Sequence, residues 1–214
     1  MKKLSTLFLG LLITIGGYAQ NSTKAKALLD EVSTKMGAYK NMYISFSSTL
    51  TNEDAGTNDT MRGNIILQGE KYNLNYLGNN FIFDGTKLYV INNEEQEINI
   101  SEGELEEDDG FIYPSKLLTF YKEGYSYSMG KIKNIRGRKV QFINLTPIDS
   151  HSEIVSVQLG VDAKTKHIYK LIQVGANGSK TTFTITKFKS NQPVSEKLFT
   201  FDKEKFLQKG FTID

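Results

Sequence analysis

Apolar and polar residues alternate with period two over residues 63–92, the stretch around which the rest of the chain is organised. This alternation is typical of half-buried antiparallel strands. Asp84-Gly85 separates two such runs and predicts a tight hairpin turn, because that turn needs a positive φ. The apolar positions that should share one face of the sheet are Ile65, Leu67, Tyr72, Leu74, Tyr76, Phe81 and Phe83.

Similar alternation on both sides predicts more strands. They are expected at residues 43–50, 96–101, 125–129, 131–135, 139–146, 153–162, 167–175 and 179–189. In the segment 153–162, Val155, Val157, Leu159 and Val161 should face the same way. Residues 52–59 are polar and rich in turn formers, which predicts a loop.

Two segments have helical rather than strand periodicity. The first is capped by Ser22 or Thr23 and runs to about residue 39, with an apolar stripe at Ala25, Leu28, Leu29, Val32 and Met36. The second, residues 114–122, begins with a proline, which is favoured in the first turn of a helix, and carries Leu117 and Leu118 on its apolar side. Two helices and many antiparallel strands without a visible linker predict a single α+β domain.

The N-terminus predicts export from the cytoplasm. Two lysines precede an apolar run of about a dozen residues, and Gly17-Tyr18-Ala19 forms a small-x-small cleavage site. We expect a signal peptide at residues 1–19 and a mature domain at 20–214. The alternative, a retained anchor helix, is disfavoured because the run is shorter than the ~20 residues needed to span a membrane. Removing the leader leaves 24 basic and 24 acidic residues, a balance that argues against nucleic acid as a partner.

No pattern in the sequence predicts catalysis. Cysteine is absent, and His151 with Asp149 and Ser150 has the composition of a polar turn rather than a nucleophile site. No phosphate-binding glycine loop, metal-binding histidine pair or dinucleotide motif is present. The acidic segment 102–110 lacks the alternating ligands and closing Glu of an EF-hand, so a solvated loop is favoured over a calcium site. We therefore expect a non-enzymatic protein without cofactor or metal.

The order of several short motifs resembles the LolA family, periplasmic carriers of outer-membrane lipoproteins. The helix 22–39 contains A-x-x-L-L-x-x-V, and the sheet contributes G-x-I-x-L, K-Y-x-L-x-Y and F-D-G-x-x-L-Y-x-x-N. P-x-x-L-L, I-x-x-V-x-L-x-V-D-x-x-T-x-x-I and a closing G-F-x-I-D follow. Each motif is weak alone, and their order over residues 24–214 carries the resemblance.

The resemblance implies an unclosed antiparallel β-barrel whose concave apolar face is covered by helices and holds acyl chains. The inward residues would be the seven apolar residues of strands 63–92 named above. The lid would consist of Leu28, Val32 and Met36 on the first helix and Leu117 and Leu118 on the second. From the residues alone, an ordinary packed core is the simpler interpretation of these positions, and the family resemblance reverses that preference.

One feature departs from the family pattern. Its best-known members carry an arginine just after the strand equivalent to residues 65–68, and this arginine bonds to the lid. Gln68-Gly69-Glu70 occupies that place here, so closure is expected to rest on apolar contacts alone.

The resemblance also implies the partners. We expect a monomer that accepts acylated lipoproteins from an inner-membrane release complex and delivers them to an outer-membrane receptor. Two alternatives remain at this stage: a carrier of another lipid or a pigment, and an envelope sensor or scaffold whose interior is filled by its own side chains.

Overall fold

The computed structural model describes residues 2–103, 116 and 119–214, with side chains from residue 20 onward. Helix α1 (Lys2–Gly37) comes first, and the other helical segments are short: η3 (Phe120–Lys122), η4 (Glu196–Phe199) and α2 (Lys203–Leu207). The strands are β1 (Met42–Asn52), β2 (Thr57–Gln68), β3 (Lys71–Tyr76), β4 (Asn79–Phe83), β5 (Lys87–Asn92), β6 (Glu97–Glu102), β7 (Tyr125–Ile135), β8 (Arg138–Pro147), β9 (Ile154–Asp162), β10 (Ile168–Gly175), β11 (Lys180–Ser190) and β12 (Thr212–Ile213).

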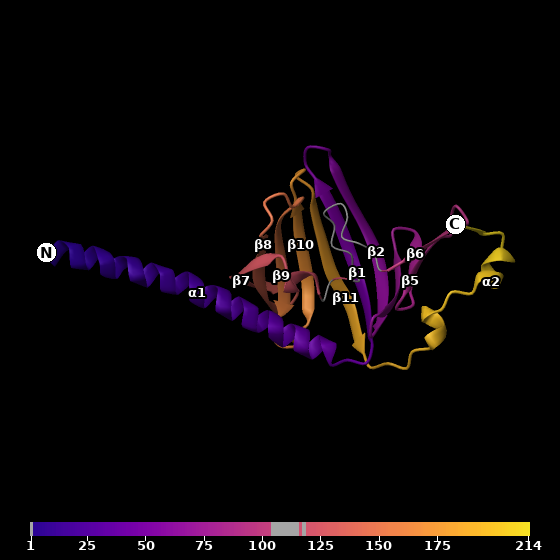
Figure 1. Ribbon diagram of the computed structural model, residues 1–214, viewed down its shortest axis with the longest axis horizontal. Helices are drawn as coiled ribbons and strands as arrows, with labels where there is room; N and C mark the ends of the chain where they lie inside the picture. The colour runs from indigo at the N-terminus through magenta and orange to yellow at the C-terminus, as the bar shows by residue number, and fades with distance from the viewer. Residues whose placement is uncertain (1, 104–115, 117–118) are drawn as a thin grey trace.

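All described strands belong to one sheet with the order β12-β6-β5-β4-β3-β2-β1-β11-β10-β9-β8-β7. Every neighbouring pair is antiparallel except β12, which runs parallel to β6. The two outermost strands do not pair with each other, and the sheet curves strongly without closing (Figure 1). The α+β fold with an unclosed antiparallel barrel is therefore confirmed.

Local turn chemistry explains why the strands reverse where they do. At the β4–β5 turn, Asp84 Oδ1 accepts hydrogen bonds of 2.8 Å from the backbone N–H groups of Thr86 and Lys87. Gly85 has φ +102°, a conformation that L side chains rarely adopt. The β9–β10 turn repeats the device, because Asp162 Oδ1 accepts from the N–H groups of Lys164 and Thr165 at 2.9 and 3.0 Å. Short acidic side chains thus fix both reversals.

The sheet packs apolar side chains on both faces. The largest cluster lies on the concave face, between the sheet and α1, and includes Leu29, Leu74, Leu159 and Leu171. A second cluster lies on the outer face at the β4–β6 end and is covered by the C-terminal segment. A third, smaller cluster lies on the outer face of β8–β10. Figure 1 shows α1 crossing the β7–β11 strands, with the C-terminal segment at the other end of the sheet.

The helix predicted from residue 22 or 23 begins instead at Lys2 and is continuous to Gly37. The sequence between these residues contains no proline, so nothing interrupts the run of helical hydrogen bonds. In the part of the chain that the structure describes, no helix is long and apolar enough to cross a membrane. Cleavage after Ala19 stays a prediction.

Several other boundaries were wrong. The predicted strands 125–129 and 131–135 form the single strand β7, which has a bulge between Met129 and Ile132. Val155 is 53% exposed instead of facing the core, because the β9–β10 register skips this residue. Of the predicted helix 114–122, residues 120–122 form the 3₁₀ turn η3, while Leu117 and Leu118 lie outside the described residues.

Candidate functional site

The concave face of the sheet brings together the apolar residues predicted for strands 63–92. The pairings Leu67↔Tyr72 and Ile65↔Leu74 between β2 and β3 place these four side chains on the same face. The pairings Tyr72↔Phe83 and Leu74↔Phe81 extend this face to β4. All seven predicted residues are buried in one contiguous cluster: Ile65, Leu67, Tyr72, Leu74, Tyr76, Phe81 and Phe83.

Helix α1 covers this cluster with the stripe that its periodicity predicts. Val32 and Met36 are buried at 0% and 1% exposure, and Leu28 is partly buried against the same cluster. Ala25 and Leu29, also on the stripe, are buried as well. The predicted lid residues of the first helix and the predicted inward residues of the sheet thus belong to one apolar cluster, in which α1 packs on the β7 side of the sheet.

Aromatic residues beyond the predicted set complete this interior. The ring of Phe46 packs edge-on against Tyr76 and Phe183, with centroid distances of 5.3 and 5.7 Å. Phe46 fits there because Gly63, opposite it on β2, has no side chain, and a Cβ on Gly63 would collide with the Phe46 ring. Alternation marked Phe46 and Phe183 as strand residues but could not place them beside Tyr76.

The interior also contains one fully buried polar pair. The Tyr76 hydroxyl donates a hydrogen bond of 2.9 Å to Ser48 Oγ, and Ser48 is 1% exposed. This bond offsets the cost of burying two hydroxyl groups in apolar surroundings. At this position the two buried hydroxyl groups therefore satisfy each other within an otherwise apolar cluster.

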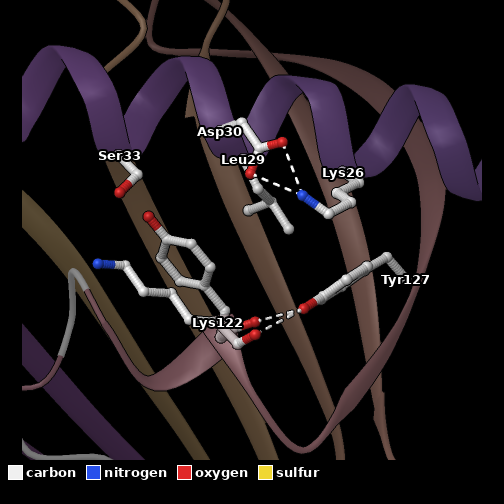
Figure 2. A pocket seen from close by; sticks show the side chains of 7 residues that line it. Lys26, Leu29, Asp30, Ser33, Lys122 and Tyr127 are labelled. Atoms are coloured by element: carbon white, nitrogen blue, oxygen red, sulfur yellow. Dashed lines mark hydrogen bonds and ion pairs between the residues drawn. The ribbon is translucent and has the colours of Figure 1, made fainter.

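A pocket opens where α1 meets the β7 edge of the sheet (Figure 2). It has a volume of about 230 Å³ and is lined by Lys26, Leu29, Asp30, Ser33, Tyr121, Lys122 and Tyr127. Its apolar base is Leu29, which is 2% exposed and belongs to the concave cluster. The pocket thus joins the outer surface to the interior along the seam between helix and sheet.

Polar groups line the rim of this seam pocket. Lys26 Nζ lies 2.8 Å from Asp30 Oδ2, and the Tyr127 hydroxyl donates a 2.7 Å hydrogen bond to the carbonyl of Tyr121. Burial raises the pKa of the Tyr121 hydroxyl, and the nearby Asp30 and Tyr127 raise it further, while the neighbouring Ser33 side chain acts in the opposite direction. The Tyr121 hydroxyl therefore stays protonated near neutral pH and keeps the rim uncharged at this point.

Three polar contacts fasten α1 and the residues after it to the sheet. Asn21 Oδ1 accepts a 3.0 Å hydrogen bond from the backbone N–H of Met129. Lys166 Nζ in the β9–β10 turn lies 3.0 Å from Glu31 Oε2. The Tyr39 hydroxyl lies 2.8 Å from His167 Nε2. These contacts show that the expectation of closure by apolar contacts alone was wrong. They were not predicted because the paired residues are distant in the sequence and no local pattern relates them.

The family's arginine position has a different role here. The side chain of Gln68 donates a hydrogen bond to Glu196 of η4, and Lys71 Nζ lies 3.3 Å from Glu196 Oε2. Both contacts attach the C-terminal segment to the sheet instead of attaching α1. The polar contacts of α1 and of the residues after it described above lie at β7 and at the β9–β10 turn.

His167 is the titratable member of this fastening. Burial lowers the pKa of its imidazole below the usual 6.5, and the Lys35 ammonium lowers it further, while Asp162 acts in the opposite direction. Its ring also packs against Phe188 with a centroid distance of 4.2 Å. The neutral imidazole is therefore the form favoured beneath the end of α1.

Two features of the described residues bear on metal or catalytic chemistry. Among these residues, no cluster of three or more His, Asp or Glu side chains could hold a metal ion. His151 lies 3.4 Å from Asp149, but both side chains are exposed in a surface turn. The concave cluster itself consists of apolar and aromatic side chains.

Comparison with known proteins agrees with this geometry. The family model described as "Outer membrane lipoprotein carrier protein LolA" matches residues 38–202, more than three quarters of the chain. The chain belongs to the LolA family. The match begins just after α1, so the LolA-type region is the sheet with the first part of its C-terminal segment.

Solved structures resemble this chain at low sequence identity, and the first named here shares its fold. An uncharacterised conserved protein from Thermus thermophilus has a TM-score of 0.55 and 8% identity, covering 85% of this chain and 96% of its own. A LolA superfamily protein from Nitrosomonas europaea has a TM-score of 0.47 and 13% identity, covering 84% and 98%. Lipoprotein LppX from Mycobacterium tuberculosis has a TM-score of 0.45 and 14% identity, covering 79% and 98%. No curated protein matches the sequence.

Proposed function

We propose that the interior between α1 and the concave face of the sheet binds the acyl chains of lipoproteins in the periplasm. The protein carries them from the inner to the outer membrane, and its task is binding rather than catalysis. The observation that supports this most is the continuous apolar surface of the sheet beneath a single long helix, with a pocket along their seam.

The physical need for such a carrier follows from the hydrophobic effect. Each CH₂ group moved from an apolar environment into water costs ~0.8 kcal/mol, so a triacylated protein cannot cross an aqueous compartment unaided. A carrier must cover the chains and later release them. A cover that separates from the sheet without breaking a β-ladder meets both requirements.

Loading requires α1 to move. The seam pocket of about 230 Å³ is smaller than the ~300–1,000 Å³ of typical small-ligand pockets. The helix and the sheet both contribute fully buried side chains to the concave cluster, and Val32 and Met36 of α1 and Leu74 of β3 are at most 1% exposed. Acyl chains would replace the contacts between these two sets of side chains, with the release complex and the receptor supplying or accepting the cargo.

A cross-linking experiment tests whether movement of α1 admits acyl chains. The protein contains no cysteine, so a Glu31→Cys/Lys166→Cys pair can be bridged selectively by a short bifunctional maleimide across a contact of 3.0 Å. We expect bridging to reduce the uptake of a triacylated lipopeptide by at least ~10-fold. The matched control is Lys87→Cys/Glu102→Cys, whose 3.2 Å ion pair joins β5 and β6 away from the helix. Bridging this pair should leave uptake unchanged.

The cargo itself is identified from protein recovered from the periplasm without detergent. Mass spectrometry should find triacylated protein in stoichiometric amount. Another lipid or a pigment alone would reassign the cargo within the same site. Protein that is empty and also fails to bind a fluorescent fatty acid would contradict the proposal, because the interior would then be an ordinary core.

A further inference from the structure

Charge is distributed unevenly along the chain. Residues 125–190, which form β7–β11, contain 11 basic and three acidic residues. Residues 20–124 and 191–214 contain 13 basic and 21 acidic residues. Residues 20–214 thus have a net charge near zero because a strongly basic half of the sheet is balanced by an acidic remainder. Such an asymmetry points to an anionic partner.

Strand geometry places many of these cations on the outer face, away from α1. Lys133 on β7 pairs with Val140, and Lys170 on β10 pairs with Gly160, both on the side opposite the concave cluster. Lys180 on β11 lies on the same side, because its neighbour Thr181 is buried. The outer face of β7–β11 is thus a basic surface, which we call the basic face.

The cations of the basic face are held in place by aromatic rings. Lys133 Nζ lies 5.3 Å from the centroid of Phe142, and the Arg138 guanidinium lies 5.5 Å from that of Tyr169. Such contacts hold the side-chain stem against the sheet and leave the charged group accessible to solvent. Lysines anchored in this way lose less conformational entropy when they bind a partner.

At least one cation of the basic face already has an anionic partner within the protein. The carboxylate of Asp162 is nearly buried and already accepts hydrogen bonds from Arg138 and from the turn that it caps. Burial lowers the pKa of Lys170, and the neighbouring Arg136, Lys133 and Lys180 lower it further. Lys133, Lys170 and Lys180 lie on the same face of the sheet, and an external anion would reduce the repulsion among like charges there.

An open groove of about 510 Å³ lies on the basic face beside the bulge of β7. Lys131 and Lys133 supply positive charge at its edge, Asn144 and Gln158 supply side-chain amides, and Phe142 supplies an apolar wall. Ammonium and amide N–H groups are suited to phosphate oxygens. The apolar wall suits the glycerol and first methylene groups beneath a phosphate.

We propose that the basic face docks the protein on an anionic phospholipid membrane, with the groove receiving a phosphorylated headgroup. A membrane fits better than one acidic peptide, because the cations are spread over β7, β8, β10 and β11. Anionic lipid surfaces attract each such cation additively within a Debye length. The proposal does not depend on the carrier function, and the seam pocket, which opens at α1, stays accessible while the opposite face is docked.

Vesicle co-sedimentation tests the proposal on the purified exported protein. It should bind vesicles of 30% phosphatidylglycerol in phosphatidylcholine at low salt, and bind pure phosphatidylcholine poorly. Lys133→Glu/Lys170→Glu should lower the partition coefficient by at least ~10-fold, because two membrane contacts are reversed in sign. Lys133→Gln/Lys170→Gln should show a smaller loss, which guards against misfolding of the first variant.

A matched pair separates local from global charge. Lys203→Glu/Lys209→Glu makes the same change in net charge on exposed residues at the other end of the molecule, and it should leave binding nearly unchanged. The proposal would be overturned if both double charge reversals reduced vesicle binding equally, or if the unmodified protein did not bind anionic vesicles at low salt. Binding to polyglutamate without binding to vesicles would also overturn it and assign the face to an acidic protein. Loss of binding in millimolar inorganic phosphate at constant ionic strength would assign it to a free anion.

Discussion

The two ends of the sheet are covered in different ways. At the β4–β6 end, the C-terminal segment covers the outer face and is joined to it by backbone pairing, since Thr212 pairs with Glu97 and Ile213 with Ile98. Asp214 adds two more backbone hydrogen bonds, one to the carbonyl of Ile98 and one from the N–H of Ile100. Beneath this cover, Ile82, Ile91, Ile98 and Phe211 form a closed apolar cluster.

At the β7–β11 end the cover is α1, on the inner face. Side chains of the helix and of the residues after it, among them Asn21, Glu31 and Tyr39, make hydrogen bonds and an ion pair to this end of the sheet. A cover held by backbone pairing is continuous with the sheet, whereas one held by side chains can leave it as a unit. The difference indicates which cover is structural and which is available for function.

The largest effect is expected where the structural cover is removed. Phe211 is 9% exposed and packs edge-on against Phe206, with a centroid distance of 5.1 Å. Phe211→Ala should lower the free energy of unfolding by about 3 kcal/mol in urea titrations, because the cluster loses its outermost ring. Leu207→Ala, at a 50% exposed position of the adjacent α2, should change it little. If Phe211→Ala instead increased hydrogen exchange only in the C-terminal segment and left the free energy of unfolding unchanged, this cover would also be separable from the sheet.

A smaller global effect is expected when the contacts of α1 are weakened. Met36 is 1% exposed under the helix, and Met36→Ala removes contacts of a kind that contribute ~2 kcal/mol or more in a rigid core. If α1 opens as a unit, hydrogen exchange should rise mainly in α1, while the amides of β9 and β10 change little. Thr34→Ala on the exposed side of the helix is the control. A uniform rise over helix and sheet would show that α1 is part of one cooperative core.

The ion pair between Glu31 and Lys166 should contribute less than about 1 kcal/mol, since both side chains remain partly exposed at 52% and 31%. A double-mutant cycle with Glu31→Gln and Lys166→Gln measures the coupling. The effect of this ion pair on the opening of α1 should weaken in high salt, because partly exposed charges are screened. A coupling of zero at low salt would leave Asn21 and Tyr39 as the polar fastenings of the helix.

Period-two alternation was sufficient to predict an antiparallel α+β domain and the shared apolar face of β2–β4, whereas the unclosed barrel was predicted from the family resemblance. The alternation is local, and each of these strands is paired with its neighbour in sequence, so register follows from short turns such as Asp84-Gly85. The apolar stripe of α1 was predictable for the same reason. These are the parts of the structure in which sequence neighbours are also spatial neighbours.

The parts that could not be predicted depend on residues distant in sequence. Lys166 and Glu31 are separated by 135 positions, and the pairing of β12 with β6 joins residues 115 apart. The C-terminal segment carried aromatic residues, but no pattern indicated that they would cover the outer face of β4–β6. The bulge in β7 was missed because alternation is lost where one strand contains extra residues.

The smallest effect concerns pH and the end of α1. Because burial and Lys35 lower the pKa of His167 in the folded state, the unfolded chain takes up a proton first as the pH falls. The stability associated with neutral His167 is therefore present above the pKa of the unfolded state, about 6.5, and is lost progressively below it.

The unfolding temperature, measured between pH 7.5 and 5, should decrease as the pH falls. His167→Gln should make this decrease smaller, because Gln can still hydrogen-bond to Tyr39 but does not titrate. The matched control is His151→Gln, whose side chain is 93% exposed and should leave the slope unchanged. If acidification also increases amide hydrogen exchange in α1 more than in β4–β6, the helix is the separable cover. Equal increases in both regions would show that the two covers of the sheet do not differ in this respect.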